Sequence, residues 1–93
     1  MNYSAKDIEK AKELKSMGYN WVARNQDNSV TAFKTKPIKT EFGWNVVAKV
    51  YDILLYGAPW KDIYEDCFKS INKYDSEPTD IDKIIESNNM EDE

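Results

Sequence analysis

The first stretch of the chain repeats apolar residues at a spacing of three or four, which predicts an amphipathic helix. Ser4 suits the N-cap of this helix, and Asp7 three residues later completes a pattern like a capping box. Tyr3 and Ile8 occupy the two positions of a hydrophobic staple. Gly18 follows the last apolar residue and suits the left-handed position after a helix. We expect this helix to pack its narrow apolar stripe on one face of a sheet.

The pattern then changes to two short β-rich runs on either side of a polar stretch, residues 25–29. This predicts an antiparallel hairpin within residues 18–36. Asp27 and Asn28 tolerate the positive φ angles of a tight turn and are predicted to be its two loop residues. In that register Val22 lies opposite Phe33.

Pro37 lacks a backbone N–H, so the second run ends there or forms the edge of a sheet. Lys34, Lys36 and Lys39 surround it. Lysine and proline protect an exposed edge from aggregation, and the same lysines can form a basic binding strip.

Residues 44–56 fit both a helix and a buried strand. Asn45 and Gly57 suit helix caps, whereas the many β-branched residues favour a strand. Thirteen residues without a turn signal favour the helix. One helical face then holds Val47, Ala48, Tyr51, Leu54 and Leu55.

Helical spacing returns after Pro59, a residue that suits a first turn, and predicts a helix through Ile71. Its apolar positions are Trp60, Ile63, Tyr64, Cys67, Phe68 and Ile71. After the break at residues 76–78, Thr79 and Asp82 are expected to cap a short last helix. The stripe of this last helix is Ile81, Ile84 and Ile85, and from Ser87 onward the polar chain is expected to fray.

These elements predict an α+β fold: an N-terminal helix, a small antiparallel hairpin or sheet, and two to three C-terminal helices. Residues 1–78 form a single small domain, and residues 79–93 form an acidic C-terminal helix and tail. The length of 93 residues fits one hydrophobic core.

Charge is unevenly distributed along the chain. Residues 75–93 carry a net charge of −7, and residues 1–74 carry +3. The acidic tail suits solubility, recognition of a basic groove, or both. Its docking on the protein's own core is the favoured interpretation, with recognition of a partner as the alternative.

Cys67 is the only cysteine, which excludes an internal disulfide and fits a reducing cytosol. We find no apolar run of membrane-spanning length and no signal-peptide pattern, so we expect a cytoplasmic protein without membrane contact.

Candidate catalytic chemistry is sparse. The chain has no histidine, and Cys67 lies in an apolar stripe without a histidine partner, so we expect a core thiol. One cysteine cannot form a closed zinc site, and no glycine-rich phosphate loop is present. Asp62, Glu65 and Asp66 are interpreted as a solvated helix face and not as a magnesium site. We therefore expect a non-enzymatic protein without cofactor or metal.

Two binding surfaces remain as hypotheses. A protein partner would contact the acidic residues, namely Asp62, Glu65, Asp66, Asp80, Asp82 and Glu86. A nucleic acid would contact Arg24, Lys34, Lys36 and Lys39, with Tyr19, Trp21 and Phe33 available for stacking.

The hairpin resembles a group of small accessory proteins of Gram-positive phages and prophages. These share a Gly-Tyr-x-Trp-x-Ala-Arg segment, an Asp-Gly turn, a strand that ends in Lys-Pro, and a downstream tryptophan. The matching positions here are Gly18, Tyr19, Trp21, Val22, Ala23, Arg24, Asp27, Lys36, Pro37 and Trp44, and Asn28 stands where the turn of the group commonly has glycine. About thirty residues are covered.

The resemblance implies a phage accessory protein inside the bacterial host cell, where such proteins often bind a host protein. We therefore expect it to inhibit or redirect a host factor, such as a defence nuclease or a replication or transcription component. Nucleic-acid binding is the alternative, and a structural or assembly role is the second alternative.

Overall fold

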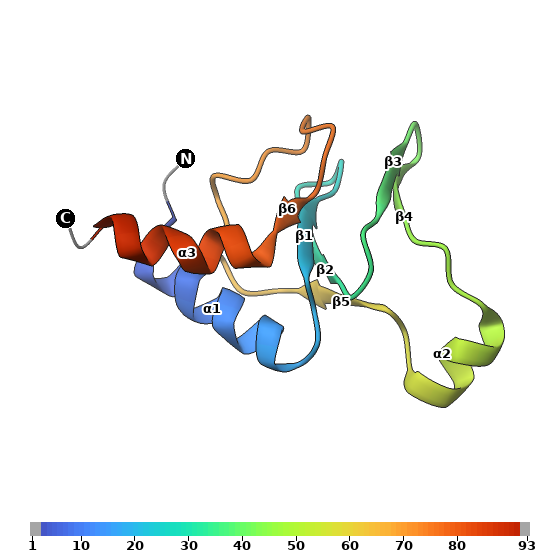
Figure 1. Ribbon diagram of the computed structural model, residues 1–93. Coiled ribbons are helices and arrows are strands. Elements are labelled where there is room, and N and C mark those ends of the chain that lie inside the picture. Colours follow the sequence, from blue (N-terminus) through green and yellow to red (C-terminus); the bar gives the residue numbers. More distant parts are fainter. Residues whose placement is uncertain (1–2, 92–93) are drawn as a thin grey trace.

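Helices and short strands alternate along the chain in the computed structural model, which describes residues 3–91, with the side chains of residues 88–91 left out (Figure 1). The elements are α1 (Ala5–Ser16), β1 (Trp21–Arg24), β2 (Val30–Phe33), β3 (Ile38–Thr40), β4 (Gly43–Asn45), α2 (Val50–Tyr56), β5 (Trp60–Ile63), β6 (Thr79–Asp80) and α3 (Ile81–Glu91).

The caps predicted for α1 are confirmed. The Ser4 hydroxyl accepts the Asp7 N–H at 3.1 Å, and the Asp7 carboxylate accepts the Ser4 N–H at 3.0 Å. At the other end Gly18 has a φ of +94° and donates its N–H to Lys15, while Tyr19 donates to Leu14. These two bonds form a Schellman motif, which satisfies carbonyls that the helix leaves unpaired.

The hairpin is confirmed, but its predicted register is wrong by one residue. Val22 pairs with Ala32, and Trp21 pairs with Phe33. The loop holds three residues between a closing pair, with the Asn25 N–H donating to Ser29 at 2.7 Å. Asn28 takes the left-handed position at φ +73°, which is the geometry of a three-residue hairpin loop.

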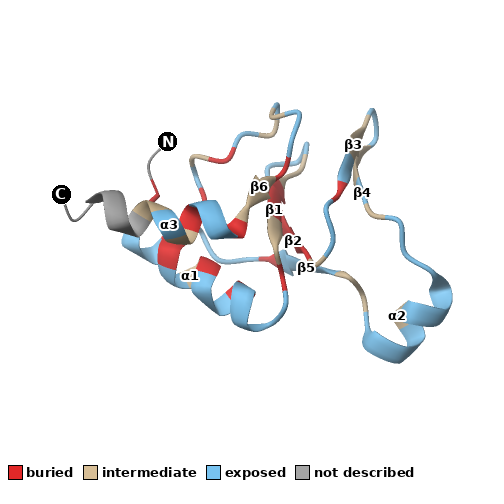
Figure 2. Ribbon diagram, in the orientation of Figure 1, coloured by how far each residue is buried: buried red, intermediate tan, exposed pale blue. Residues whose placement is uncertain are grey.

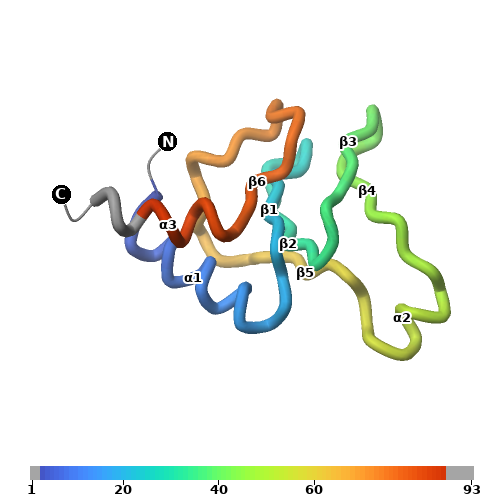
Figure 3. Tube along the Cα trace, viewed as in Figure 1, coloured from blue at the N-terminus to red at the C-terminus, as the bar shows by residue number. Residues whose placement is uncertain are grey.

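The hairpin forms the middle of a larger sheet. Four antiparallel strands lie in the order β5-β2-β1-β6, and β3 and β4 form a separate two-stranded sheet. In Figure 3 the trace passes from the hairpin into β3–β4 and α2 before it returns to β5. The predicted α+β fold with an N-terminal helix and a small antiparallel sheet is therefore confirmed, but the expectation that only helices follow the hairpin is wrong, because β3 to β6 come after it.

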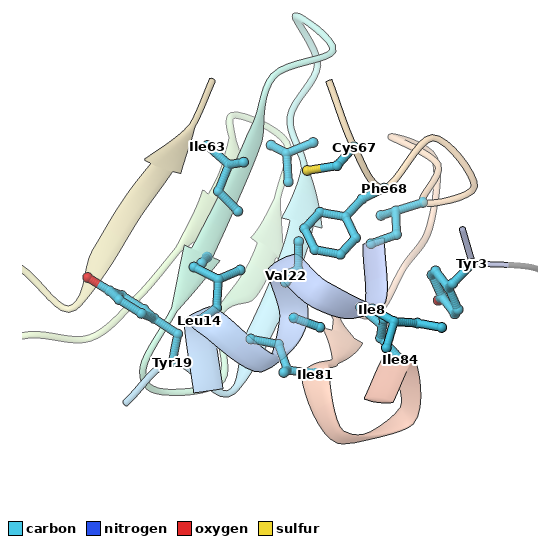
Figure 4. Packing of buried hydrophobic residues seen from close by; sticks show 14 residues of the cluster. Tyr3, Ile8, Leu14, Tyr19, Val22, Ile63, Cys67, Phe68, Ile81 and Ile84 are labelled. Atoms are coloured by element: carbon cyan, nitrogen blue, oxygen red, sulfur yellow. The ribbon is translucent and has the colours of Figure 1, made fainter. Parts of the chain in front are cut away.

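The core lies between the sheet and the two long helices (Figure 4). On the sheet side it contains Val22, Val30, Ala32 and Ile63, and the long helices contribute Ile8, Ala11, Leu14, Ile81 and Ile84. Both staple residues, Tyr3 and Ile8, are buried in it. We call this side of the sheet the inner face and the opposite side the outer face.

The helix predicted from Pro59 to Ile71 is wrong. Residues 60–63 form β5, which pairs with β2, and the segment that follows is irregular until β6. Cys67, Phe68 and Ile71 are nevertheless buried in the core, as their apolar character predicts. The unpaired edge of β2 provides a ladder of hydrogen bonds, and this long-range pairing outweighs the local periodicity.

Residues 44–56 divide between the two predicted alternatives. Trp44 and Asn45 belong to β4, and only residues 50–56 are helical. Lys49, and not Asn45, is the N-cap of α2, while Gly57 follows it as predicted with a φ of +83°.

The predicted last helix is confirmed as α3, with Ile81 and Ile84 fully buried and Ile85 partly buried. Its cap differs from the prediction, because Thr79 lies in β6 and Asp80 accepts the Asp82 N–H at 2.9 Å. The helix continues to Glu91, beyond the predicted start of fraying at Ser87. The last two residues of the predicted tail, 92 and 93, lie outside the described residues.

The elements form three successive parts: the helix pair α1 and α3, the four-stranded sheet, and a projecting segment that holds β3, β4 and α2 (Figures 1 and 2). We call this projecting segment, residues 38–59, the arm. The molecule extends 46 × 28 × 20 Å, and the arm lies at the end away from α3. None of the helices within residues 3–91 is long and apolar enough to cross a membrane.

Candidate interaction surface

The arm exposes apolar side chains that a folded chain normally buries. No residue of α2 is buried, and Figure 2 shows this helix almost entirely in the colour of exposed residues. The exposed fractions are 72% for Val50, 70% for Tyr51, 80% for Leu54, 55% for Leu55 and 74% for Tyr56. Val47, just before the helix, is 89% exposed. We call these six side chains the patch, and exposed apolar side chains gathered on one short segment are typical of an interaction site.

The base of the arm is fixed to the body. The Trp44 indole N–H donates to the Arg24 carbonyl at 3.0 Å. The Lys39 ammonium donates to the carbonyls of Lys73 at 2.9 Å and Asp75 at 2.7 Å, and it also lies over the Trp44 ring. These contacts hold the β3–β4 sheet in place, whereas α2 has only Ile53 half-buried.

Three aromatic side chains form a row across the outer face of the sheet. The register places Trp60 beside Phe33 and Phe33 beside Trp21. Together with Trp44 of the arm, two of these rings border an open cleft of about 390 Å³. We call this the aromatic cleft; its lining is Asn25, Thr31, Phe33, Trp44, Asn45, Val46, Trp60 and Asp62.

A chain of hydrogen bonds fixes the polar side of the aromatic cleft. The Asn25 amide donates to the Thr31 hydroxyl at 2.9 Å, and this hydroxyl donates to the Asp62 carboxylate at 3.0 Å. Thr31 is buried, so its interactions set the position of Asp62 on the neighbouring strand. The cleft therefore presents a positioned carboxylate beside aromatic rings.

Each residue of the predicted basic strip has a partner within the molecule. The Arg24 guanidinium donates to the carbonyls of Ile71 at 2.7 Å and Phe68 at 2.8 Å, and also to that of Asn28. Lys36 pairs with Glu77 at 3.3 Å and lies over Trp21. Lys34 lies over Tyr19, and Lys39 is held as described above. Nucleic-acid contact by these residues remains a prediction.

The predicted acidic residues are divided between two edges of the sheet. Asp62 lies on edge strand β5, and Asp80 lies on the opposite edge strand, β6. Glu65 and Asp66 follow β5 in irregular chain, not on the predicted helix face, and Asp82 and Glu86 lie on α3. Four ion pairs involve these residues: Glu65 with Lys10, Asp66 with Lys69, Asp82 with Lys15 and Glu86 with Lys83.

The Lys10–Glu65 pair, with a separation of 2.8 Å, joins α1 to the segment after β5. The hydrogen bond from Lys10 lowers the pKa of the Glu65 carboxyl below its ordinary value. The same bond raises the pKa of the Lys10 ammonium. Both shifts favour the charged forms, so the pair is an ion pair at neutral pH.

The residues considered for catalysis have structural positions. Cys67 is buried, and desolvation raises the pKa of its thiol, which disfavours the nucleophilic thiolate. Among the described residues, no group of three or more Cys, Asp and Glu side chains is arranged to hold a metal ion.

Sequence reasoning missed the arm and the aromatic cleft. The available signal was composition, because residues 44–56 contain only two charged residues, Lys49 and Asp52. A helix on the surface needs more polar positions than this to face water. The cleft depends on strand pairing across distant segments, which periodicity does not reveal.

Comparisons with protein-family models, curated proteins and solved structures gave no match to this chain. The chemistry of the surface therefore follows from its own geometry.

Proposed function

We propose that this chain is a non-enzymatic phage accessory protein that binds a host protein and inhibits or redirects it, with the arm as the main contact element. The observation that carries the proposal is α2, a helix of seven residues with no buried side chain. Isolated helices shorter than about 12–15 residues are marginal in water. A partner surface would supply the packing that α2 lacks within its own chain.

The size of the exposed patch supports a protein as the partner. Aromatic side chains bury about 150–250 Å² each at an interface. The six apolar side chains of the patch therefore represent much of the roughly 800 Å² that one protein contributes to a standard interface. A groove that accepts the apolar side chains of a short helix is a common mode of protein recognition.

The partner is expected to be another protein and not a second copy of this chain. Lys34 and Asp52 line a pocket beside Val47 and Tyr56 of the patch, whereas Asp62 is the charged residue of the neighbouring aromatic cleft, which no lysine or arginine of the described residues lines. At the aromatic cleft, a second copy docked cleft to cleft would bring the same carboxylate and no complementary charge. A partner with an apolar groove and a basic residue beside it complements both features.

The test uses Leu54→Asp in the arm and Tyr64→Asp as a control, because Tyr64 is 91% exposed and lies outside the arm. Affinity capture from host lysate with mass spectrometry first identifies candidate targets. Calorimetry with the purified target should then show a loss of affinity of about 30-fold or more for Leu54→Asp, as for a hot-spot residue, and little loss for the control. The melting temperature of both variants should match the wild type, because neither side chain is buried.

Three results would overturn this proposal. The first is equal binding of the purified target by Leu54→Asp and the wild type. The second is a dimer in light scattering that Leu54→Asp converts to a monomer, which would make a second copy the occupant of the arm. The third is binding of DNA or RNA at low salt that is lost on replacing Lys34, Lys36 and Lys39 with alanine, which would favour nucleic-acid recognition.

A further inference from the structure

The aromatic cleft combines aromatic rings with a single charge. Trp44, Trp60 and the largely buried Phe33 contribute the rings, and Asp62 is the only charged residue in the lining within the described part of the chain. Trp60 is 42% exposed, so at least one indole is accessible from solvent. Aromatic faces and a carboxylate are each complementary to a cation.

The negative charge of Asp62 is not neutralised within the described chain. Its one hydrogen bond comes from the neutral Thr31 hydroxyl, and no lysine or arginine forms an ion pair with it. The next two acidic residues differ, since Glu65 pairs with Lys10 and Asp66 pairs with Lys69. Asp62 therefore offers a positioned charge that an external cation can meet.

We propose that the aromatic cleft binds the side chain of an arginine that is presented by the protein partner of the arm. This inference rests on the proposed function. A guanidinium is planar, so it stacks on an indole and donates two parallel hydrogen bonds to a carboxylate. A lysine ammonium is a strongly hydrated point charge without a flat face, which suits this lining less well.

The position and the size of the cleft fit one side chain of a protein already docked on the arm. Val46 lines the cleft, and the exposed Val47 follows it at the start of the segment that leads to α2. A partner that covers α2 therefore lies beside the cleft. The volume of about 390 Å³ is near the lower end of the roughly 300–1,000 Å³ of small-molecule sites.

The test is a titration of the isolated protein with N-acetyl-arginine amide, followed through the indole N–H resonances in NMR spectra. N-acetyl-citrulline amide has nearly the same shape without the charge and is the matched control. We expect millimolar half-saturation with arginine at Trp44 and Trp60. Trp21 lies on the same outer face but does not line the cleft, so its resonance is the internal reference.

Asp62→Asn tests the role of the carboxylate, because asparagine keeps an acceptor for the Thr31 hydroxyl and removes only the charge. We expect it to weaken arginine binding at least threefold, on the order of an exposed ion pair. Asp66→Asn removes a carboxylate outside the cleft and should leave the titration unchanged.

Equal responses to arginine and citrulline, no response at Trp60, or full binding by Asp62→Asn would each overturn the inference. A stronger response to a thymidine tetranucleotide would also overturn it and identify the cleft as a base-stacking site. Because the probe is a single amino-acid amide, the result does not depend on α2 or on the target of the arm. Failure here is thus distinguishable from failure of the proposed function.

Discussion

Phe68 has a left-handed backbone conformation, with a φ of +60°, although its side chain is fully buried. For a bulky residue this conformation costs on the order of 1–3 kcal/mol. Two charged side chains hold it from distant parts of the chain. The Asp7 carboxylate accepts the Phe68 N–H at 2.6 Å, and the Arg24 guanidinium donates to the Phe68 carbonyl at 2.8 Å. Asp7 and Arg24 thus direct the ring into the core.

Asp7→Ala removes both the capping bond to Ser4 and the acceptor for the buried Phe68 N–H. We expect the free energy of unfolding to fall by about 3 kcal/mol, from the lost cap and the unpaired donor. Urea denaturation measures this change. Glu9→Ala, an exposed position on the same helix, should cost far less, and equal losses for the two variants would contradict the assigned role of Asp7.

The buried Cys67 thiol should resist modification in the folded protein, because burial blocks access and raises its pKa. Ellman's reagent is expected to react with it only after unfolding, at a rate that rises with urea in parallel with the unfolded fraction. Complete labelling within seconds in native buffer would show that the segment around Phe68 is not packed as described.

At the scale of elements, the sequence correctly predicted features that depend only on residues close together in the chain. The caps of α1 and the isoleucine stripe of α3 depend on residues three to five apart, and both are confirmed. The helix expected from Pro59 failed, because pairing with β2 and the contacts of Asp7 and Arg24 involve residues 27 to 61 positions away. The candidate site depends on the same long-range pairing. Asp62 was singled out from the sequence, but its neighbours in the cleft were not.

The C-terminal helix should contribute directly to stability, since Ile81 and Ile84 are fully buried against the core. Ile84→Ala is expected to lower the free energy of unfolding by about 2–5 kcal/mol through lost burial and a cavity. With about 4–8 °C per kcal/mol for a domain of this size, calorimetry should show a drop of at least roughly 8 °C. Lys83→Ala on the exposed side is the matched control. An unchanged melting temperature for Ile84→Ala would contradict docking of α3.

At the scale of the whole molecule, the Lys10–Glu65 pair makes stability depend on pH at both ends of the range. The lowered pKa of Glu65 gives a stabilisation that is present above its unfolded pKa and is lost as pH falls through the folded value. The raised pKa of Lys10 gives a second stabilisation. It is present below the unfolded pKa of Lys10 and is lost as pH rises through the folded pKa.

Glu65→Gln should therefore flatten the acid side of the stability curve below the ordinary glutamate pKa, when urea midpoints are compared across pH. Glu9→Gln also removes a carboxylate but does not break this pair, so its stability should depend on pH in the same way as that of the wild type. If the urea midpoints of Glu65→Gln and the wild type fell identically at acid pH, the pair would not contribute to stability.

The attachment of α2 through two chain segments, without burial of its side chains, also determines how the protein opens. Its roughly two helical turns can unwind without disturbing the core between the sheet and the long helices, so local opening and global unfolding are separate events. Backbone amides of α2 should exchange with deuterium within seconds, whereas those of β1 and β2 should exchange only through global unfolding. A protease would likewise cut the arm first and leave the body folded, and a bound partner would slow both processes at the arm alone.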